Sequence, residues 1–382
     1  KLNIFENRVF LPTTFLLIVS FIWFSKIFYI WDHDTGFWYL VSNNFDDDYI
    51  PYKNEFDNKG PLFFLFIKVL STIIGYGVYQ AYILYSLIIF LFFTVLLYLI
   101  NQKKIDYKVF WILILSFTSI FLIKKPHIVF ILFYYCFFLF FIHFLLISIQ
   151  KRNNYYFLLS IFFFSLCSIV LVDIYLYTPL VLFAFVYLLL NKKKHVHKLL
   201  LYIILCLVIF FGINTLPQIY YGYDFTDFIR TNFFYNQTIK SEGPVKSLNF
   251  IYFLILTLIL PLFIKAIYFS NIKKFIFNRF DIFILGLFIL ISILKYLLFS
   301  NGSGGRHILY LYIPLIYFII YFAESIRINK FFLYFYFFLL IIVHTKNLAP
   351  PVFKNFIKHN CIINFYCDAP SYANLFKETV NY

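Results

Sequence analysis

The chain consists of long apolar runs separated by short polar segments. A helix that crosses a bilayer needs about 20 apolar residues. Runs near this length predict about eleven transmembrane helices, at residues 9–30, 77–101, 109–123, 127–150, 155–172, 174–191, 199–216, 250–269, 281–299, 307–324 and 331–345. We therefore expect an all-α polytopic membrane protein, with a transmembrane domain over residues 1–345 and a short extracytoplasmic tail over 346–382.

One apolar run, at residues 61–75, is shorter than the others. Gly60 and Pro61 mark its beginning, and Gly75 marks its end. A run of this length falls short of the roughly 20 residues that a spanning helix needs. We expect an interfacial or re-entrant helix here, within a first outer loop that covers residues 31–76.

Basic residues indicate the orientation of the predicted helices. Lys and Arg cluster at every second connection, and cytoplasmic connections carry an excess of these residues. The N-terminus, with Lys1 and Arg8, belongs to the same side. The extracytoplasmic side then receives residues 31–60, 217–249 and 300–306 and the tail. The clusters are Lys103, Lys104 and Lys108; Lys151 and Arg152; Lys192, Lys193, Lys194 and Lys198; Lys273, Lys274 and Arg279; and Arg327 and Lys330.

The composition excludes several classes of protein. With 63% hydrophobic and 13% charged residues, the chain has too few charges for the surface of a soluble domain. The net charge of +15 arises from clusters between apolar runs, so we expect no nucleic-acid partner. The phosphate-binding pattern G-x-x-x-x-G-K-[ST] is absent from the sequence, and ATP-driven transport by this chain is therefore not expected.

The sulfur-containing residues give limited information. Cys136, Cys167 and Cys206 lie within apolar runs, where we expect small buried side chains. Cys361 and Cys367 share the polar tail, and a disulfide between them stays open. Because the sequence has no Met and begins at Lys1, we expect a processed, trimmed or edited version of a gene product, and a truncated tail stays open.

The first outer loop concentrates acidic residues in a chain that is otherwise poor in them. Asp32 and Asp34 directly follow the first apolar run, where desolvation at the membrane boundary makes a carboxylate a stronger base. Two simpler interpretations stay open, namely a solvated acidic loop and, for Asp34, a helix N-cap. Seven carboxylates lie between residues 32 and 57, and those of the central group fit a solvated turn: Asp32, Asp34, Asp46, Asp47, Asp48, Glu55 and Asp57.

Several segments of the chain form motifs beyond the acidic residues. They are Asp34-Thr35-Gly36-Phe37-Trp38-Tyr39, Pro51-Tyr52, Phe56-Asp57-Asn58-Lys59-Gly60-Pro61-Leu62, residues 228–236, and residues 304–310 before Pro314. These segments resemble motifs of the GT-C membrane glycosyltransferases, of the protein mannosyltransferase and aminoarabinose transferase type. The similarity covers most of the chain in helix layout and is most specific in the first loop. Many such proteins are bacterial sugar transferases of lipid glycans, which implies the inner membrane of a bacterium as the location.

The resemblance implies an inverting glycosyltransferase that uses a polyprenyl-phosphate sugar on the extracytoplasmic face. Asp34 would be the general base, and Asp32 would share this role or bind a cation. The leaving phosphate needs fixed positive charge, for which Arg suits bidentate binding best. The implied phosphate ligands are Lys59, Arg230, Arg306 and His307, and Tyr235 and Asn236 are candidates for the acceptor site. Simpler interpretations of these residues stay open. Lys59 fits an interfacial anchor, and Arg306 a Gly-rich turn that binds no phosphate. His307 fits a structural side chain at a helix start, and the second-loop residues fit a lipid-facing interfacial loop.

The chain departs from the family in one respect. GT-C enzymes often carry a second acidic residue at the outer start of a middle helix, where this chain has Lys124-Lys125-Pro126-His127. His127 is one candidate to replace it, and Asp173, at an outer helix end, is another. This departure leaves open whether a divalent cation is bound, and the sequence identifies no other cofactor.

Two alternative functions stay open. A transporter or flippase of lipid-linked glycans would need polar residues deep within several spans, and the predicted helices carry few. A polysaccharide polymerase or ligase would share the chemistry of the outer face. The sequence does not identify the sugar or the acceptor, whether glycan, lipid or protein, and leaves the oligomeric state open.

Overall fold

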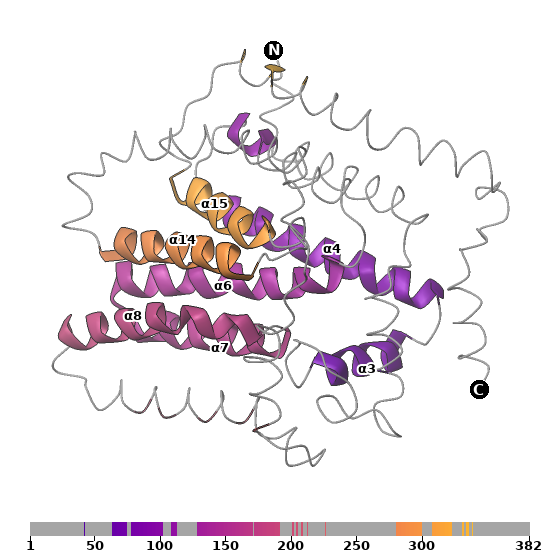
Figure 1. The fold of residues 1–382 in the computed structure, drawn as a ribbon, viewed down its shortest axis with the longest axis horizontal. Coiled ribbons are helices and arrows are strands. Elements are labelled where there is room, and N and C mark those ends of the chain that lie inside the picture. Colours follow the sequence, from indigo (N-terminus) through magenta and orange to yellow (C-terminus); the bar gives the residue numbers. More distant parts are fainter. Residues whose placement is uncertain are drawn as a thin grey trace.

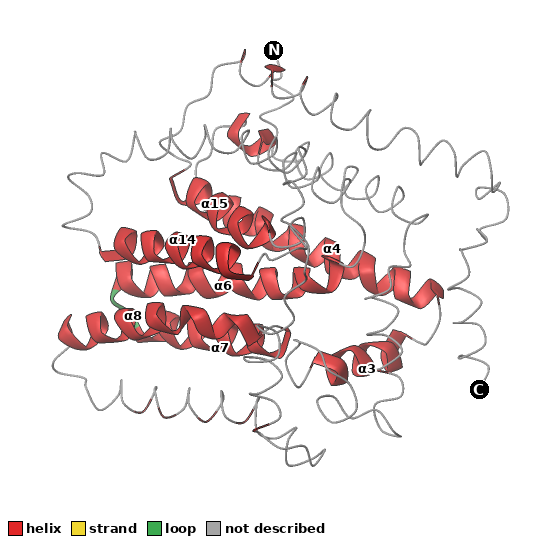
Figure 2. Ribbon diagram, in the orientation of Figure 1, coloured by secondary structure: helices red, strands yellow, loops and turns green. Residues whose placement is uncertain are grey.

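In the computed structural model, the described part of the chain is helical and contains no strand (Figures 1 and 2). At this level the predicted all-α class is confirmed. Most of the first outer loop, the second outer loop and the tail lie outside the described residues. These residues are 42, 63–74, 78–101, 108–112, 128–170, 172–191, 201, 204, 208, 212, 226, 280–299, 308–322, 331, 334, 335 and 338.

The helix boundaries follow the apolar runs closely. The predicted runs 77–101, 127–150, 155–172, 281–299 and 307–324 agree with helices of the structure to within two residues at each end. The bounds are α3 Phe63–Ile74, α4 Val78–Asn101, α6 Ile128–Lys151, α7 Asn154–Val170, the 3₁₀ helix η3 Val172–Tyr177, α8 Thr178–Asn191, α14 Phe280–Phe299 and α15 Ile308–Phe322.

Other predicted spans are not tested in this way. The runs 9–30 and 250–269 lie outside the described residues, and only isolated residues or a short piece are described in 109–123, 199–216 and 331–345. The predicted run 174–191 is helical but starts within η3, before the α-helix α8. The total of about eleven spans therefore stays a prediction.

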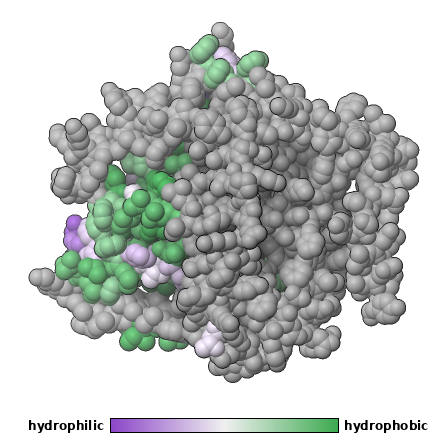
Figure 3. All heavy atoms as spheres, in the orientation of Figure 1, coloured by the Kyte–Doolittle hydropathy of each residue, from purple (hydrophilic) through white to green (hydrophobic). Residues whose placement is uncertain are grey.

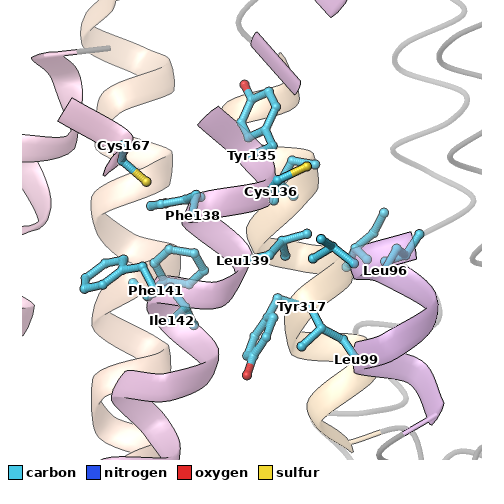
Figure 4. Packing of buried hydrophobic residues seen from close by; sticks show 14 of the residues in the cluster. Leu96, Leu99, Tyr135, Cys136, Phe138, Leu139, Phe141, Ile142, Cys167 and Tyr317 are labelled. Carbon is cyan, nitrogen blue, oxygen red and sulfur yellow. The ribbon is translucent and has the colours of Figure 1, made fainter. Parts of the chain in front are cut away.

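Helix α6 is the centre of the described bundle. It packs against α4, α7, α8, α14 and α15, and Figure 1 shows it between α14 and the α7–α8 pair. Its aromatic and aliphatic side chains supply most of the close-up in Figure 4, where they meet Leu96 and Leu99 of α4, Cys167 of α7 and Tyr317 of α15. Cys136 and Cys167 are buried, as the sequence predicts.

A tight turn joins α6 to α7. Arg152 adopts the left-handed conformation, with φ of 48°, which ends a helix by redirecting the chain. The amide of Asn153 then donates to the carbonyl oxygen of Ser148 (3.0 Å). The side chain of Asn153 accepts a bond from the amide of Tyr155 (2.9 Å), which satisfies one of the free N–H groups at the start of α7. Helices α6 and α7 consequently run antiparallel.

Aromatic contacts fix the directions of the other helices. Tyr187 near the end of α8 stacks on Phe280 at the start of α14, with ring centroids 4.3 Å apart. Tyr321 near the end of α15 bonds to Asp281 at the start of α14. The end of α6 lies at this same level, because Gln150 also bonds to Asp281. The C-terminal ends of α6, α8 and α15 thus gather around the N-terminal end of α14.

Helix α3 lies at the opposite end of α6. Its Phe66 packs edge-on against Phe133, in the first turns of α6, with ring centroids 5.2 Å apart. The helix has 12 residues, which corresponds to about 18 Å of rise. The short helix predicted at 61–75 is confirmed, and its place at the membrane interface stays a prediction.

Two segments are long and apolar enough to cross a membrane, namely Phe133–Lys151 and Ile174–Asn191. The first is 61% buried within the bundle and the second only 28%. A buried core helix of a soluble protein would also match the first, whereas the second exposes apolar side chains such as Leu182 and Leu190. Figure 3 shows hydrophobic side chains at the surface of the described part. These features suit contact with lipid.

Candidate functional site

The site residues predicted from the sequence lie almost entirely outside the described part of the chain. Asp173 is the exception, because its backbone lies in η3. The others carry no structural test here: Asp32, Asp34, Lys59, His127, Arg230, Tyr235, Asn236, Arg306 and His307.

Several of these residues directly adjoin described helices. Helix α6 begins one residue after His127, and α15 begins one residue after His307. Helix α3 begins four residues after Lys59. The start of α6 and the start of α15 lie at the end of the bundle away from Asp281, as does α3 through its contact with Phe133. Helix α3 and the first residues of α6 and α15, which are far apart in the sequence, therefore lie at the same end of the bundle.

A hydrogen-bonded network joins three helices at the other end. Gln150 Nε2 donates to Asp281 Oδ2 (2.9 Å) and to the hydroxyl of Tyr321 (2.6 Å). The Tyr321 hydroxyl in turn donates to the same carboxylate oxygen. Asp281 is only 3% exposed. It lies in the first turn of α14, where the helix dipole favours a negative charge.

A second polar contact lies deeper on the same seam between α6 and α15. His143 Nδ1 and the hydroxyl of Tyr317 are 3.2 Å apart, and the tautomer of the imidazole decides which group donates. The ring of Tyr98, from α4, meets His143 edge-on at 6.3 Å between centroids. Since His143 is half-buried and Tyr317 buried, this contact ties α4, α6 and α15 together.

The C-terminal part of α14 carries a buried cation. Lys295 is 1% exposed, and its Nζ lies 5.2 Å from the centroid of the Tyr134 ring, within the range of a cation–π interaction. Ser292, one turn earlier on α14, meets the hydroxyl of Tyr177 at 2.8 Å. Through this hydrogen bond, the end of η3 is joined to α14 close to Lys295.

Sequence reasoning passed over these buried polar groups. Asp281 and Lys295 lie within the apolar run 281–299, and His143 and Gln150 within 127–150. A single charge does not interrupt a long apolar run, which is why the hydropathy pattern alone does not select them. The free-energy cost of burying charge could have selected them. An ionisable residue within a membrane-spanning helix is costly, and such residues usually have a function.

The described residues contain no group of three or more His, Cys, Asp or Glu side chains that could hold a metal ion. The acidic first loop, for which the sequence leaves a divalent cation open, lies outside them. The polar groups of the described part lie at opposite ends of α14. The hydrogen bonds to Asp281 lie at its start, and the buried cation Lys295 lies near its end. Comparisons with protein-family models, with curated proteins and with solved structures find no match for this chain.

Proposed function

We propose that the protein is an inverting membrane glycosyltransferase of GT-C type. It moves a sugar from a polyprenyl-phosphate donor to an acceptor hydroxyl on the extracytoplasmic face. The observation that carries the proposal is the first outer loop, in which Asp32 and Asp34 follow the first apolar run and the segment 56–62 leads into α3.

The form of α3 supports this proposal. A loop that works on a lipid-linked donor needs an element lying along the membrane boundary, beside which the polyprenyl chain can enter. Helix α3 is too short to cross a bilayer, because its 12 residues rise about 18 Å against a hydrocarbon core of about 30 Å. It exposes Val69 and Ile73 while burying Phe63, Phe64 and Ile67, so it offers apolar surface beyond its contact with the bundle.

The arrangement of helix ends also supports it. Lys151 and Arg152 lie at the turn between α6 and α7, at the Asp281 end of the bundle. The contact between Phe66 and Phe133 lies at the opposite end of α6. If basic connections face the cytoplasm, α3 and the loop before it face outward, as does the loop that precedes α15.

The proposed reaction is a single displacement. Asp34 accepts the proton of the acceptor hydroxyl as its oxygen bonds to the anomeric carbon. The bond from that carbon to the donor phosphate oxygen breaks, its electron pair leaves with the phosphate, and the configuration inverts. Lys59, Arg230, Arg306 and His307 are the proposed groups that stabilise the phosphate anion. Asp32 is the proposed neighbour that shares the base role.

The test is sugar transfer in proteoliposomes loaded with polyprenyl-phosphate sugars, comparing the unaltered protein with Asp34→Asn at equal folded amounts. We expect Asp34→Asn to lower the rate about 10²- to 10⁴-fold, the usual contribution of a general base, while donor binding is retained. Asp47→Asn, in the same loop and with the same change of charge, is the matched control and should transfer normally. Full activity of Asp34→Asn would remove the base role from this residue.

The buried charges favour a second candidate function, a transporter or flippase of lipid-linked glycans. Asp281, Lys295 and His143 show that the described helices hold more polar groups than the apolar pattern suggests. The discriminating result is movement of a labelled donor across the vesicle membrane without cleavage of its sugar. Transfer of the sugar with release of polyprenyl phosphate favours the enzyme.

A further inference from the structure

The turn between α6 and α7 carries two exposed cations, Lys151 and Arg152. In the part of the chain that the structure describes, neither side chain forms an ion pair. The acidic residue described at this end of the bundle, Asp281, is 3% exposed and accepts hydrogen bonds from Gln150 and Tyr321. The turn therefore presents positive charge that no described carboxylate neutralises.

Arg152 has a backbone conformation that is unfavourable for its residue type. Its φ of 48° lies in the left-handed region, which glycine and asparagine adopt more easily than residues with long side chains. Glycine is the usual residue at this position after a helix. An arginine here costs backbone stability, and residues held in such conformations cluster at binding sites. The choice of residue therefore points to a role for the guanidinium group.

Aromatic rings hold Lys151 in place. Its Nζ lies 5.0 Å from the centroid of the Tyr156 ring, at the start of α7, within the range of a cation–π interaction. The Tyr156 ring in turn stacks on Phe144 of α6, with centroids 6.3 Å apart and planes 12° apart. The side chain of Lys151 is nevertheless exposed, so its ammonium can also contact an anionic partner.

Half-buried aromatic rings continue from Tyr156 toward the middle of the bundle. Phe163 of α7 stacks on Phe144, with centroids 5.6 Å apart. It also contacts Phe140, one turn earlier on α6, at 4.9 Å between centroids. The rings of Tyr156, Phe144, Phe163 and Phe140, here called the aromatic column, join the cationic turn to an apolar surface.

Helix α7 exposes two further aromatic side chains next to the aromatic column. Tyr155 is 59% exposed and contacts Tyr156, and Phe162 is 42% exposed and contacts Phe163. Tyr155 lies at the level of the turn, and Phe162 follows seven positions later, about two helical turns deeper. Tyrosine is common at the level of lipid headgroups, and phenylalanine suits the hydrocarbon region. Positive charge above such a surface matches a lipid with an anionic headgroup.

We propose that the α6–α7 turn binds the phosphate headgroup of an anionic phospholipid in the leaflet that it faces, which is the cytoplasmic leaflet by the positive-inside rule. Arg152 donates to two phosphate oxygens and Lys151 supplies the second positive charge. An acyl chain of the lipid lies along the aromatic column. Basic pockets between helices on the cytoplasmic side bind headgroups of this kind. The proposal does not depend on the transferase function, because the turn lies at the Asp281 end of the bundle, away from α3.

Lipid binding by the purified full chain in a neutral detergent tests the proposal. Phosphatidylglycerol is added stepwise and the bound lipid is counted by native mass spectrometry, while the thermal midpoint reports stabilisation by the bound lipid. We expect phosphatidylglycerol to saturate and to raise the midpoint, and phosphatidylcholine and inorganic phosphate to leave it unchanged. An equal shift with phosphatidylcholine would reject recognition of the charge, and an equal shift with inorganic phosphate would reject the lipid as the ligand.

Arg152→Gly is the most informative substitution, because glycine suits the left-handed position and the turn is kept. The midpoint without lipid should be retained or rise. The half-saturating concentration of phosphatidylglycerol should rise about fivefold, the effect of one basic residue near an anionic lipid surface. Lys151→Gln should give a similar increase. Normal lipid binding by Arg152→Gly, with a lower midpoint in the absence of lipid, would show a structural residue and overturn the proposal.

Lys108→Gln is the matched control. It removes one positive charge from another connection predicted on the same side, and it should leave the half-saturating concentration unchanged. Tyr156→Leu should raise this concentration about threefold through loss of the cation–π contact, and Tyr156→Phe should restore binding. Equal weakening in Lys108→Gln and Arg152→Gly would mean that lipid responds to net charge alone, and the proposed site would be rejected.

Discussion

The two ends of α14 bury opposite charges in different surroundings. At its start, the Asp281 carboxylate is held by neutral donors from two other helices, Gln150 of α6 and Tyr321 of α15. Near its end, the Lys295 ammonium faces the ring of Tyr134 and lies one turn from the bond between Ser292 and Tyr177. At the start of α14, directional hydrogen bonds to Asp281 hold three helices together. Near its end, the charge of Lys295 acts over a longer range than a hydrogen bond does.

This difference suggests that the two charges have different roles, one in stability and one in function. A carboxylate that accepts hydrogen bonds from two packed helices contributes to stability and holds the bundle in one arrangement. A buried cation near the end of a helix carries a charge that acts beyond its immediate contacts. The comparison therefore predicts that changes at Asp281 affect stability most, and that changes at Lys295 affect transfer most.

The largest loss of stability is expected for Asp281→Ala. It removes the acceptor of two charge-assisted hydrogen bonds, from Gln150 and from Tyr321, at an expected cost of about 3 kcal/mol. The thermal midpoint of the detergent-purified protein measures it. Transfer per folded molecule should stay close to that of the unaltered protein, and a selective loss of transfer would break the proposed division.

Lys295→Met should give the converse pattern. Methionine has similar length and no charge, and replacing a buried charge by an apolar group is often tolerated by the fold. The thermal midpoint should therefore fall less than in Asp281→Ala, while sugar transfer falls strongly. Equal loss of stability in the two variants, with unaffected transfer in Lys295→Met, would show that both ends are purely structural.

Tyr177→Phe should have a smaller effect on stability. It removes the hydroxyl that meets Ser292 and keeps the buried ring, at a cost of about 1 kcal/mol. Thermal denaturation measures this change. Ser292→Ala removes the same contact and also the bond from Ser292 Oγ to the carbonyl oxygen of Phe288. The two substitutions together should therefore cost little more than Ser292→Ala alone. Fully additive losses would contradict this contact.

The smallest effect is expected at Leu190, which is 68% exposed on α8. Leu190→Ala should change stability by less than about 0.5 kcal/mol, as surface substitutions usually do. A spin label at Leu190→Cys should be reached by oxygen dissolved in lipid rather than by a water-soluble paramagnetic reagent. Preferential access from water would contradict a lipid-facing α8.

The sequence predicts the positions of the helices better than it predicts the contacts between them. Long apolar runs define where α4, α6 and α14 begin and end, because few polar residues compete with helix formation there. The short run before Gly75 is equally clear, and α3 is found at its predicted place. These features depend on residues that are neighbours along the chain.

The polar contacts of the bundle could not be predicted in the same way. Gln150 and Asp281 are 131 positions apart, and only the packing of α6 on α14 brings them together. Nothing in the local pattern selects either charge, since Lys295 is surrounded by apolar neighbours and Asp281 lies two positions after Arg279, at the start of an apolar run. In the first loop the sequence proposes chemistry for Asp34 from its position and motif, and that role remains a proposal.

The most direct test of the account is the fate of one labelled donor. Purified protein is reconstituted in vesicles that contain a polyprenyl-phosphate sugar labelled in both sugar and lipid, together with an acceptor extract from bacterial envelopes. The account predicts that the sugar label moves to an acceptor with inverted anomeric configuration, while an equal amount of polyprenyl phosphate is released. Donor that crosses the bilayer intact, with no sugar transferred from any member of a broad donor panel, would contradict it.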